Sequence, residues 1–411
     1  MTDVATRYGQ GELQLPFPRP DVLHLSPLFA ELRREVGPVV KVTTPTGDPA
    51  WLVIGYDEAR TAFAEKRFGY YTHPDPANAP SAADSIMIGR PIGGPAIEID
   101  MLHKRRLLTP AFSPKRMKLL HEWIQELTDQ CLDDMEAAHD ANPDEPIDFH
   151  AHLGWRLPVL VIGALLGVPD EDRDYTMELS DRMGQVGNDA DAVAAAGELR
   201  EYMEGLLEKK KGNYGEDVIS DLAKAQEADP NTFTQQPLAY HAAGLIFPGH
   251  ETTVARMDFG LMYLLQERKW KDWLMEDPEG RIGDTVEEIL RLTSAHNLGL
   301  LRWAVEEIEI GGATIMPGDL VIISESAASR DPKIWDDPET FDPSRPLTPH
   351  ASFGHGGHIC LGQSLARTEL RIVFPSLFKR FPNIRLAEDI GNLFIRDDRT
   401  GGGVDRVLVT W

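Results

Sequence analysis

A single cysteine lies in a glycine-rich stretch near the end of the chain. Residues 353–362 read Phe-Gly-His-Gly-Gly-His-Ile-Cys-Leu-Gly, and Cys360 is one of only two cysteines in 411 residues. A free cysteine is most often a small buried hydrophobic residue, and its reactivity decides whether it has a function. Zinc is a second possibility, because imidazole and thiolate are its preferred ligands and His350, His355 and His358 lie nearby. The His-x-Cys spacing is tighter than in structural zinc sites, and no second cysteine pair follows, which argues against zinc.

The glycines of this stretch favour a third interpretation, in which the cysteine is a thiolate ligand of haem iron. Gly354, Gly356, Gly357 and Gly362 allow the backbone to approach a flat ligand and to adopt positive φ, so that amide N–H groups can point at the sulfur. Such donors keep a thiolate ionised and tune the iron that it binds. The loop by itself leaves packing, zinc and haem open.

The pattern Phe-Gly-x-Gly-x-His-x-Cys-x-Gly, with Ala-Arg-x-Glu-Leu at 366–370 behind it, resembles the haem-binding loop of the cytochrome P450 family. The resemblance implies haem b with the thiolate of Cys360 as the axial iron ligand. It also implies that Phe353 and Gly354 contact the haem and that His358 donates to a haem propionate. The remaining parts of the family should then occur upstream in the same order.

A long apolar helix is expected from about Pro237 to Leu265, and it contains Pro-Gly-His-Glu-Thr at 248–252. Pro248 has no N–H for the bond to the carbonyl of Gly244, so the helix should open there. On residue types alone, this is equally a kinked core helix with a chance Glu-Thr pair. The resemblance implies that Glu251 and Thr252 deliver protons during oxygen activation. Pro248 departs from the small residue usual in the family.

Haem propionates require cationic or hydrogen-bonding partners inside a protein. The resemblance assigns this role to Arg302 and Arg105 in addition to the histidine of the loop, although the strand position of Arg302 also suits a solvated charge. Two neighbours depart from the family pattern. Met101 stands where a histidine is usual, and Leu301 stands where a proline is common.

Glu288 and Arg291 are three residues apart on a predicted helix, a spacing that occurs constantly by chance. In position they resemble the Glu-x-x-Arg pair of the family, and Arg345 supplies the second arginine of its buried triad. We therefore expect these side chains to support the haem loop without taking part in catalysis.

The resemblance also places a substrate pocket around 85–88, near the middle of the long helix and around 296–298. The apolar content of these segments suggests a terpenoid-, polyketide- or aromatic-like substrate, although ordinary core packing explains each residue as well. The candidate pocket residues are Met87, Ile88, Gly244, Phe247, Pro248, Asn297 and Leu298.

Composition and charge exclude several classes of protein. The chain is 42% apolar and 26% charged, as in ordinary globular proteins, and its net charge of −25 argues against nucleic acid or an anionic membrane as partner. Met1–Pro20 lacks the charged flank and apolar core of a signal peptide. The most apolar run, Leu157–Val168, is shorter than the roughly 20 residues of a membrane span. We expect a cytoplasmic monomer.

One basic run stands out in this acidic chain. Residues 103–118 carry Lys104, Arg105, Arg106, Lys115, Arg116 and Lys118 without a single acid, and Arg367, Arg371 and Lys379 follow the cysteine. Such a run is usually a solvated helix face. If these residues gather on the thiolate side, they would suit an acidic ferredoxin, supplied with electrons by a ferredoxin reductase.

A helical middle with strand-rich flanks predicts a mainly α fold with a smaller β region. The resemblance implies one cytochrome P450 domain over 1–411, a triangular helix-rich prism around the haem, with a β-rich part at about 1–70, a helical core at about 100–292 and a mixed part at about 293–411. The implied function is monooxygenation of a hydrophobic secondary metabolite with O2 and electrons from NAD(P)H. Two alternatives stay open: a peroxide-driven or rearranging enzyme on the same fold, and a non-catalytic haem sensor or recruitment protein.

Overall fold

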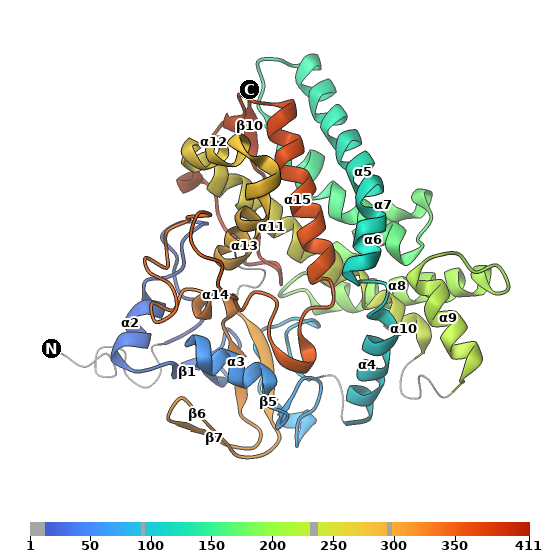
Figure 1. Ribbon diagram of the computed structural model, residues 1–411. Helices are drawn as coiled ribbons and strands as arrows, with labels where there is room; N and C mark the ends of the chain where they lie inside the picture. The colour runs from blue at the N-terminus through green and yellow to red at the C-terminus, as the bar shows by residue number, and fades with distance from the viewer. Residues whose placement is uncertain (1–12, 92–94, 231–236, 294–297) are drawn as a thin grey trace.

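The computed structural model describes residues 13–91, 95–230, 237–293 and 298–411. Helices dominate the described chain of a roughly triangular molecule, and strands lie both at its lower end in this view and at its upper end beside the C-terminus (Figure 1). The helices are α2 (Leu28–Glu35), α3 (Tyr56–Ala64), α4 (Pro95–Leu108), α5 (Pro114–Ala141), α6 (Arg156–Leu166), α7 (Arg173–Met183), α8 (Asp189–Lys210), α9 (Val218–Ala228), α10 (Leu238–Ala243), α11 (Ile246–Gln266), α12 (Arg268–Glu276), α13 (Pro278–Leu292), α14 (Glu325–Ala328) and α15 (Gln363–Arg380). The predicted mainly α fold with a smaller β region is confirmed.

The strands are short and form small sheets. They are β1 (Val39–Thr43), β2 (Pro49–Val53), β3 (Phe68–Gly69), β4 (Ile147–Asp148), β5 (Leu300–Ala304), β6 (Ile308–Ile310), β7 (Ala313–Ile315), β8 (Leu320–Ile323), β9 (Arg385–Leu386) and β10 (Leu408–Thr410). The largest sheet has the order β1-β2-β8-β5-β3, in which β2 and β8 run parallel. This sheet therefore joins the two flanks that the sequence suggested as separate β-rich parts.

The β-rich part near the N-terminus contains an antiparallel hairpin of β1 and β2. Val39 pairs with Val53 and Thr43 with Pro49 in antiparallel register. The turn between them contains Gly47, whose φ of +89° favours glycine. Local turn chemistry was sufficient to predict this unit.

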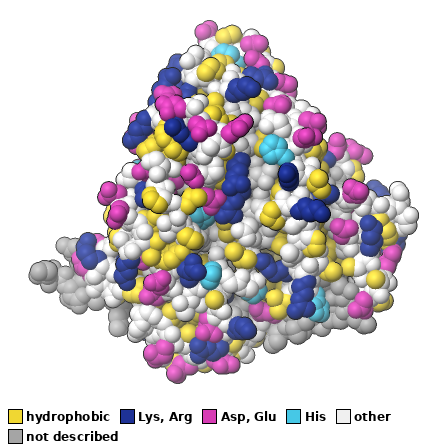
Figure 2. Space-filling view, in the orientation of Figure 1, with side chains coloured by type: hydrophobic (Ala, Val, Ile, Leu, Met, Phe, Trp, Pro, Cys, Tyr) yellow, Lys and Arg dark blue, Asp and Glu magenta, His cyan; other side chains and the backbone are white. Residues whose placement is uncertain are grey.

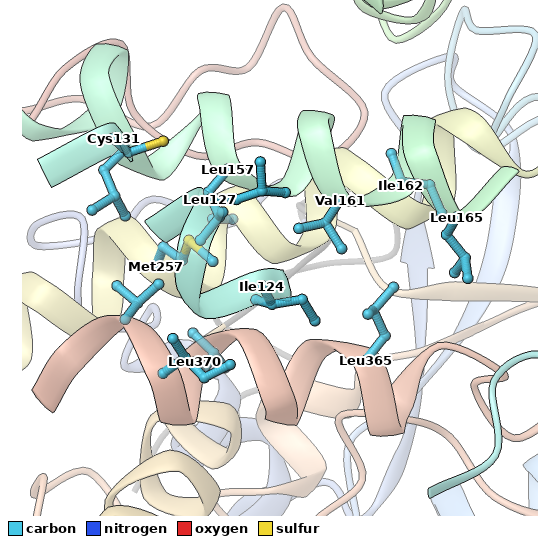
Figure 3. Close-up of a cluster of buried hydrophobic side chains, with 14 of the residues drawn as sticks. Ile124, Leu127, Cys131, Leu157, Val161, Ile162, Leu165, Met257, Leu365 and Leu370 are labelled. Atoms are coloured by element: carbon cyan, nitrogen blue, oxygen red, sulfur yellow. The ribbon is translucent and has the colours of Figure 1, made fainter. Parts of the chain in front are cut away.

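The core of the helical body lies between α5, α6, α11 and α15 (Figure 3). Every residue of α11 from Thr253 to Leu264 is buried, as expected for a helix that is covered on all sides. Two glycines bring neighbouring helices unusually close to α11. A Cβ on Gly249 would lie 2.7 Å from the side chain of Ile162 on α6, and one on Gly260 would lie 2.7 Å from Phe374 on α15.

The single long helix expected over 237–265 is divided in two. α10 ends at Ala243 and α11 begins at Ile246, so the break falls at Gly244, whose carbonyl Pro248 cannot bond. The predicted opening is thus confirmed, and it lies one turn before the proline. None of the described helices is long and apolar enough to cross a membrane.

Candidate active site

The cysteine loop between β8 and α15 has the backbone that its glycines predict. Gly354 and Gly356 have φ values of +69° and +74°, and the N–H of Cys360 donates to the carbonyl of Phe353 at 2.8 Å. The loop rests on α3, because a Cβ on Gly356 would lie 3.0 Å from the Cα of Ala64. Glycine is required here both for conformation and for this close approach.

The sulfur of Cys360 is half-buried two residues before the first turn of α15. Burial raises the pKa of the Cys360 thiol, whereas the N–H of Gly362 and the positive charges of Arg105, Arg256 and Arg367 act in the opposite direction. Burial thus disfavours the ionised thiolate, whereas one backbone donor and three arginines favour it. A thiolate at this position is suited to bonding a cationic metal, which would remove the cost of burying the anion.

The histidines near the cysteine do not converge on it as zinc ligands. The Nε2 of His350 lies 3.2 Å from Glu287, and the Nε2 of His358 lies 3.8 Å from Glu98. Within the described part of the chain, no three His, Cys, Asp or Glu side chains come together as a metal-ion cluster. The zinc alternative is therefore wrong for the described residues.

Arg302 lies on β5 and is buried, with 3% of its surface exposed. Its guanidinium covers the ring of Tyr70 at 4.4 Å from the centroid and donates to the carbonyl of Leu301 at 2.7 Å. Burial lowers the pKa of Arg302, and among the described residues no carboxylate lies within ion-pairing distance of it. A buried guanidinium without a carboxylate favours a ligand that brings one.

Tyr70 connects Arg302 to the cysteine loop. Its ring is stacked on the imidazole of His358, with centroids 5.2 Å apart and planes 13° apart. Burial, followed by the charge of Arg302, lowers the pKa of His358. Arg302 and His358, both predicted from the sequence, therefore lie on the same tyrosine, Tyr70. The sequence analysis did not predict this tyrosine as a site residue.

Arg105 on α4 is directed to the cysteine loop, since its Nη2 donates to the carbonyl of Ile359 at 2.5 Å. Met101, one turn earlier, is half-buried.

Lys104 was not predicted as a site residue. Burial lowers the pKa of Lys104 to about 8, and its Nζ would lie 3.8 Å from a Cβ on Gly244.

One face of the first turns of α11, together with Gly244 before the helix, is accessible to solvent although the rest of α11 is buried in the core. Gly244 and Pro248 are exposed and Thr252 is half-buried, and these positions recur every four residues. The hydroxyl of Thr252 donates to the carbonyl of Pro248 at 3.1 Å. The stripe therefore presents, on the accessible face, an alcohol bonded to a helix carbonyl.

Glu251 is directed away from this stripe. A Cβ on Gly401 would lie 2.7 Å from its Cδ, and one on Gly184 would lie 3.4 Å from its Oε1. Burial raises the pKa of Glu251 to about 7, against the positive charge of Arg399. The carboxyl group of Glu251 can therefore bind or release a proton near neutral pH. Gly401 and Gly184, which lie against it, were not predicted from the sequence.

The other predicted pocket residues are dispersed. Phe247 is buried against the turn after α7, where a Cβ on Gly184 would lie 2.7 Å from its ring. Met87 is exposed and Ile88 packs on the same apolar cluster as the buried Leu298. Asn297 lies outside the described residues.

The expected triad of Glu288, Arg291 and Arg345 is confirmed. Glu288 bonds Arg291 at 2.8 and 2.9 Å and Arg345 at 3.0 Å, and it also accepts from the N–H of Asp342 at 2.9 Å. Both Glu288 and Arg291 are almost fully buried.

The neighbouring Glu287 forms a second support that the sequence did not predict. Burial would raise the pKa of Glu287, but hydrogen bonds from Arg367 and His350 lower it to about 2. Arg367 bonds its two oxygens at 2.6 and 2.8 Å and covers the ring of Phe353 at 4.6 Å. Arg367 therefore supports the cysteine loop through Glu287 and Phe353, in addition to lying on the thiolate side as expected.

Comparison with known proteins finds relatives that match nearly the whole chain. The family model described as cytochrome P450 matches residues 186–386. The chain is 34% identical to cytochrome P450 BJ-1 homolog of Sinorhizobium fredii, over 97% of this chain and 98% of the relative, and 33% identical to cytochrome P450 monooxygenase PikC of Streptomyces venezuelae, over 94% and 90%. Among solved structures, the putative thioether synthase SgvP, involved in the tailoring step of griseoviridin, superposes with a TM-score of 0.86 at 31% identity, covering 97% of this chain and 99% of that one.

Proposed function

The chain belongs to the cytochrome P450 family, and from this premise we propose that it is a haem-thiolate monooxygenase that tailors a hydrophobic secondary metabolite. The observation that carries the proposal is the buried guanidinium of Arg302, which has no carboxylate of the described residues within ion-pairing distance and lies beside the glycine-rich loop of Cys360. These residues fit a flat metal complex that bears carboxylates. When bound, the haem supplies the redox chemistry of oxygen activation, which side chains lack.

The chain's own residues would then have separate roles. The thiolate of Cys360 would bind the haem iron, and Phe353 and Gly354 would contact the haem from the loop. Arg105, Arg302 and His358 would neutralise and hold the propionates, because Arg105 bonds the loop at Ile359 and the other two flank the ring of Tyr70. Glu251 and Thr252 move protons, and the accessible Gly244 and Pro248 form part of the substrate wall together with Ile88, Met87, Leu298, Phe247 and Asn297.

Replacing Thr252 by alanine tests the proton role. Positioned acid and base groups typically contribute about 100-fold or more to a rate, so we expect product formation to fall about 100-fold while hydrogen peroxide rises. The measurement is the ratio of product and peroxide to NADH consumed, with a compound selected for binding to the ferric enzyme. Thr253→Ala is the matched control, since Thr253 is the adjacent, buried threonine. Unchanged product formation in Thr252→Ala would remove Thr252 from the mechanism.

We propose that electrons come from NAD(P)H through a ferredoxin and its reductase. Lysine and arginine side chains lie in the middle of the face formed by α15 and α5 (Figure 2). Arg371 and Lys379 are exposed on α15, and Lys115 and Lys118 are exposed on α5. This face adjoins the cysteine loop, so an acidic partner bound there would have a short path to the thiolate.

Replacing Arg371 by glutamate tests this docking face. We expect the rate constant for the first electron from a reduced plant-type [2Fe–2S] ferredoxin to fall about 10-fold at low salt and to approach the wild-type value at high salt, because charge steering is screened. Stopped-flow spectroscopy measures it. Lys209→Glu on α8, an exposed lysine of another helix, should have little effect. Equal losses in both variants would contradict docking at α15.

The localisation and assembly follow from the same premise. We propose a cytoplasmic monomer of one domain over 1–411, with a small-molecule substrate and no nucleic-acid partner. The family membership and the acidic net charge of −25 support this.

A further inference from the structure

A tight turn near the C-terminus, residues 396–403, lies against the acid of α11. The N–H of Arg396 donates to the carbonyl of Gly403 at 3.0 Å, and the N–H of Gly402 donates to the carbonyl of Arg399 at 3.2 Å. Gly402 and Gly403 have φ values of +63° and +85°, which a turn of this kind requires. We call residues 396–403 the C-terminal turn.

The C-terminal turn is hydrogen-bonded to the segment that follows α7. The N–H of Thr400 donates to the carbonyl of Gly184 at 2.9 Å, and the N–H of Val186 donates to the carbonyl of Asp398 at 2.8 Å. The guanidinium of Arg399 reaches Asp181 at 2.7 Å. The backbone pairing and the ion pair fix the C-terminal turn relative to the end of α7.

A third segment joins this contact. The N–H of Gly187 donates to the carbonyl of Asp84 at 2.8 Å, and the hydroxyls of Ser85 and Thr400 are 3.3 Å apart. Residues 84 and 85 directly precede the candidate pocket residues Met87 and Ile88. Three segments far apart in the chain therefore meet above the same part of α11.

Two of these segments place a glycine against Glu251. A Cβ on Gly401 would lie 2.7 Å from Cδ and 2.8 Å from Oε2 of Glu251, and one on Gly184 would lie 3.4 Å from Oε1. Real Cβ atoms essentially never approach other atoms within 3.0 Å. Gly401 is not in the left-handed region, so its backbone would accept alanine and only the space forbids it.

We propose that Gly401 is a positioning residue that leaves a slot for the carboxyl group of Glu251, that Gly184 borders this slot in van der Waals contact, and that the slot exists only while the C-terminal turn is bound to the segment after α7. The inference rests on the proposed role of Glu251 in proton transfer. It adds that the hydrogen bonds between residues 84–85, the segment after α7 and the C-terminal turn also determine the position of the Glu251 carboxyl group. A displacement of the C-terminal turn, for example by a substrate that enters beside Ile88, moves the slot as well.

The electrostatics of the slot agree with this arrangement. Burial raises the pKa of Glu251, and the charge of Asp181 on α7 acts in the same direction. Arg399 and Arg396 of the C-terminal turn and the N–H of Gly401 lower it. The groups that face the carboxyl thus come from α7 and from the turn, so the affinity of Glu251 for a proton depends on both being in place.

Infrared titration of the haem-loaded enzyme tests the slot directly. The band of the protonated Glu251 carboxyl is identified as the one that Glu251→Gln removes, and in the wild type it should titrate with a midpoint near pH 7. In Gly401→Ala the added methyl group should displace the carboxyl from its buried seat, so the midpoint should fall by about one pH unit or more toward that of a solvated carboxyl. Gly205→Ala on α8 is the control, because nothing lies within 4 Å of its Cβ position and its backbone is helical without positive φ.

An unshifted midpoint in Gly401→Ala, or an equal shift in Gly205→Ala, would overturn the slot. A rescue variant adds a second criterion. Glu251→Asp shortens the side chain by one methylene group, so adding Gly401→Ala to it should shift the midpoint less than in the wild type, and an equally large shift would also contradict the slot. The proposed proton role fails separately, if Glu251→Gln leaves the ratio of product to peroxide unchanged while the infrared shift is still seen.

Discussion

Replacing Cys360 by serine is expected to abolish the thiolate-type absorption of the reduced carbon monoxide complex and to lower monooxygenase turnover by more than about 100-fold. Even partners that only support a metal ligand typically contribute about 10- to 100-fold, so loss of the ligand itself should exceed this. The donors around the sulfur would remain in place, because the loop is held by the Cys360 N–H to Phe353 bond and by Arg105 at Ile359. The difference spectrum and the haem content measure the two effects.

The other cysteine provides the control. Cys131 is fully buried on α5 in the core shown in Figure 3, and burial raises the pKa of its thiol to about 11. Cys131→Ala should retain the thiolate-type spectrum and lose only some stability, since it leaves a small cavity. A normal spectrum in Cys360→Ser, or its loss in Cys131→Ala, would show that Cys360 is not the ligand.

Replacing Glu288 by alanine is expected to lower the free energy of unfolding by about 3–5 kcal/mol, because it leaves the buried guanidinium of Arg291 without its carboxylate. The loss should extend to the cysteine loop, since Glu288 also holds Arg345 and the N–H of Asp342. Urea unfolding measures the free energy, and haem retention during the titration reports on the loop.

Glu276→Ala is the comparison for this variant. Its carboxylate pairs with Arg281 at 2.7 Å, but 69% of the Glu276 side chain is exposed, and exposed pairs contribute only about 0–1 kcal/mol. Similar losses in the two variants would mean that burial does not decide the contribution of Glu288.

Several features of this protein followed from the sequence because they depend on neighbouring residues. Pro248 removes one helix hydrogen bond wherever the helix packs, so the break at Gly244 was predictable. The positive φ values of Gly354 and Gly356 and the first hairpin follow in the same way from residue type. The motif around Cys360 indicated the family, and the family in turn implied the fold.

Other features could be decided only by tertiary packing. The pairing of β2 with β8 joins residues about 270 positions apart, and no local pattern specifies a partner at that distance. The pairing of Arg367 with Glu287 rather than with solvent, the stacking of Tyr70 between Arg302 and His358, and the seat of Glu251 against Gly401 are of the same kind. The sequence alone determined which groups could act, because chemistry belongs to residue types. The tertiary structure decided which groups meet, because burial and long-range packing set their contacts and their pKa values.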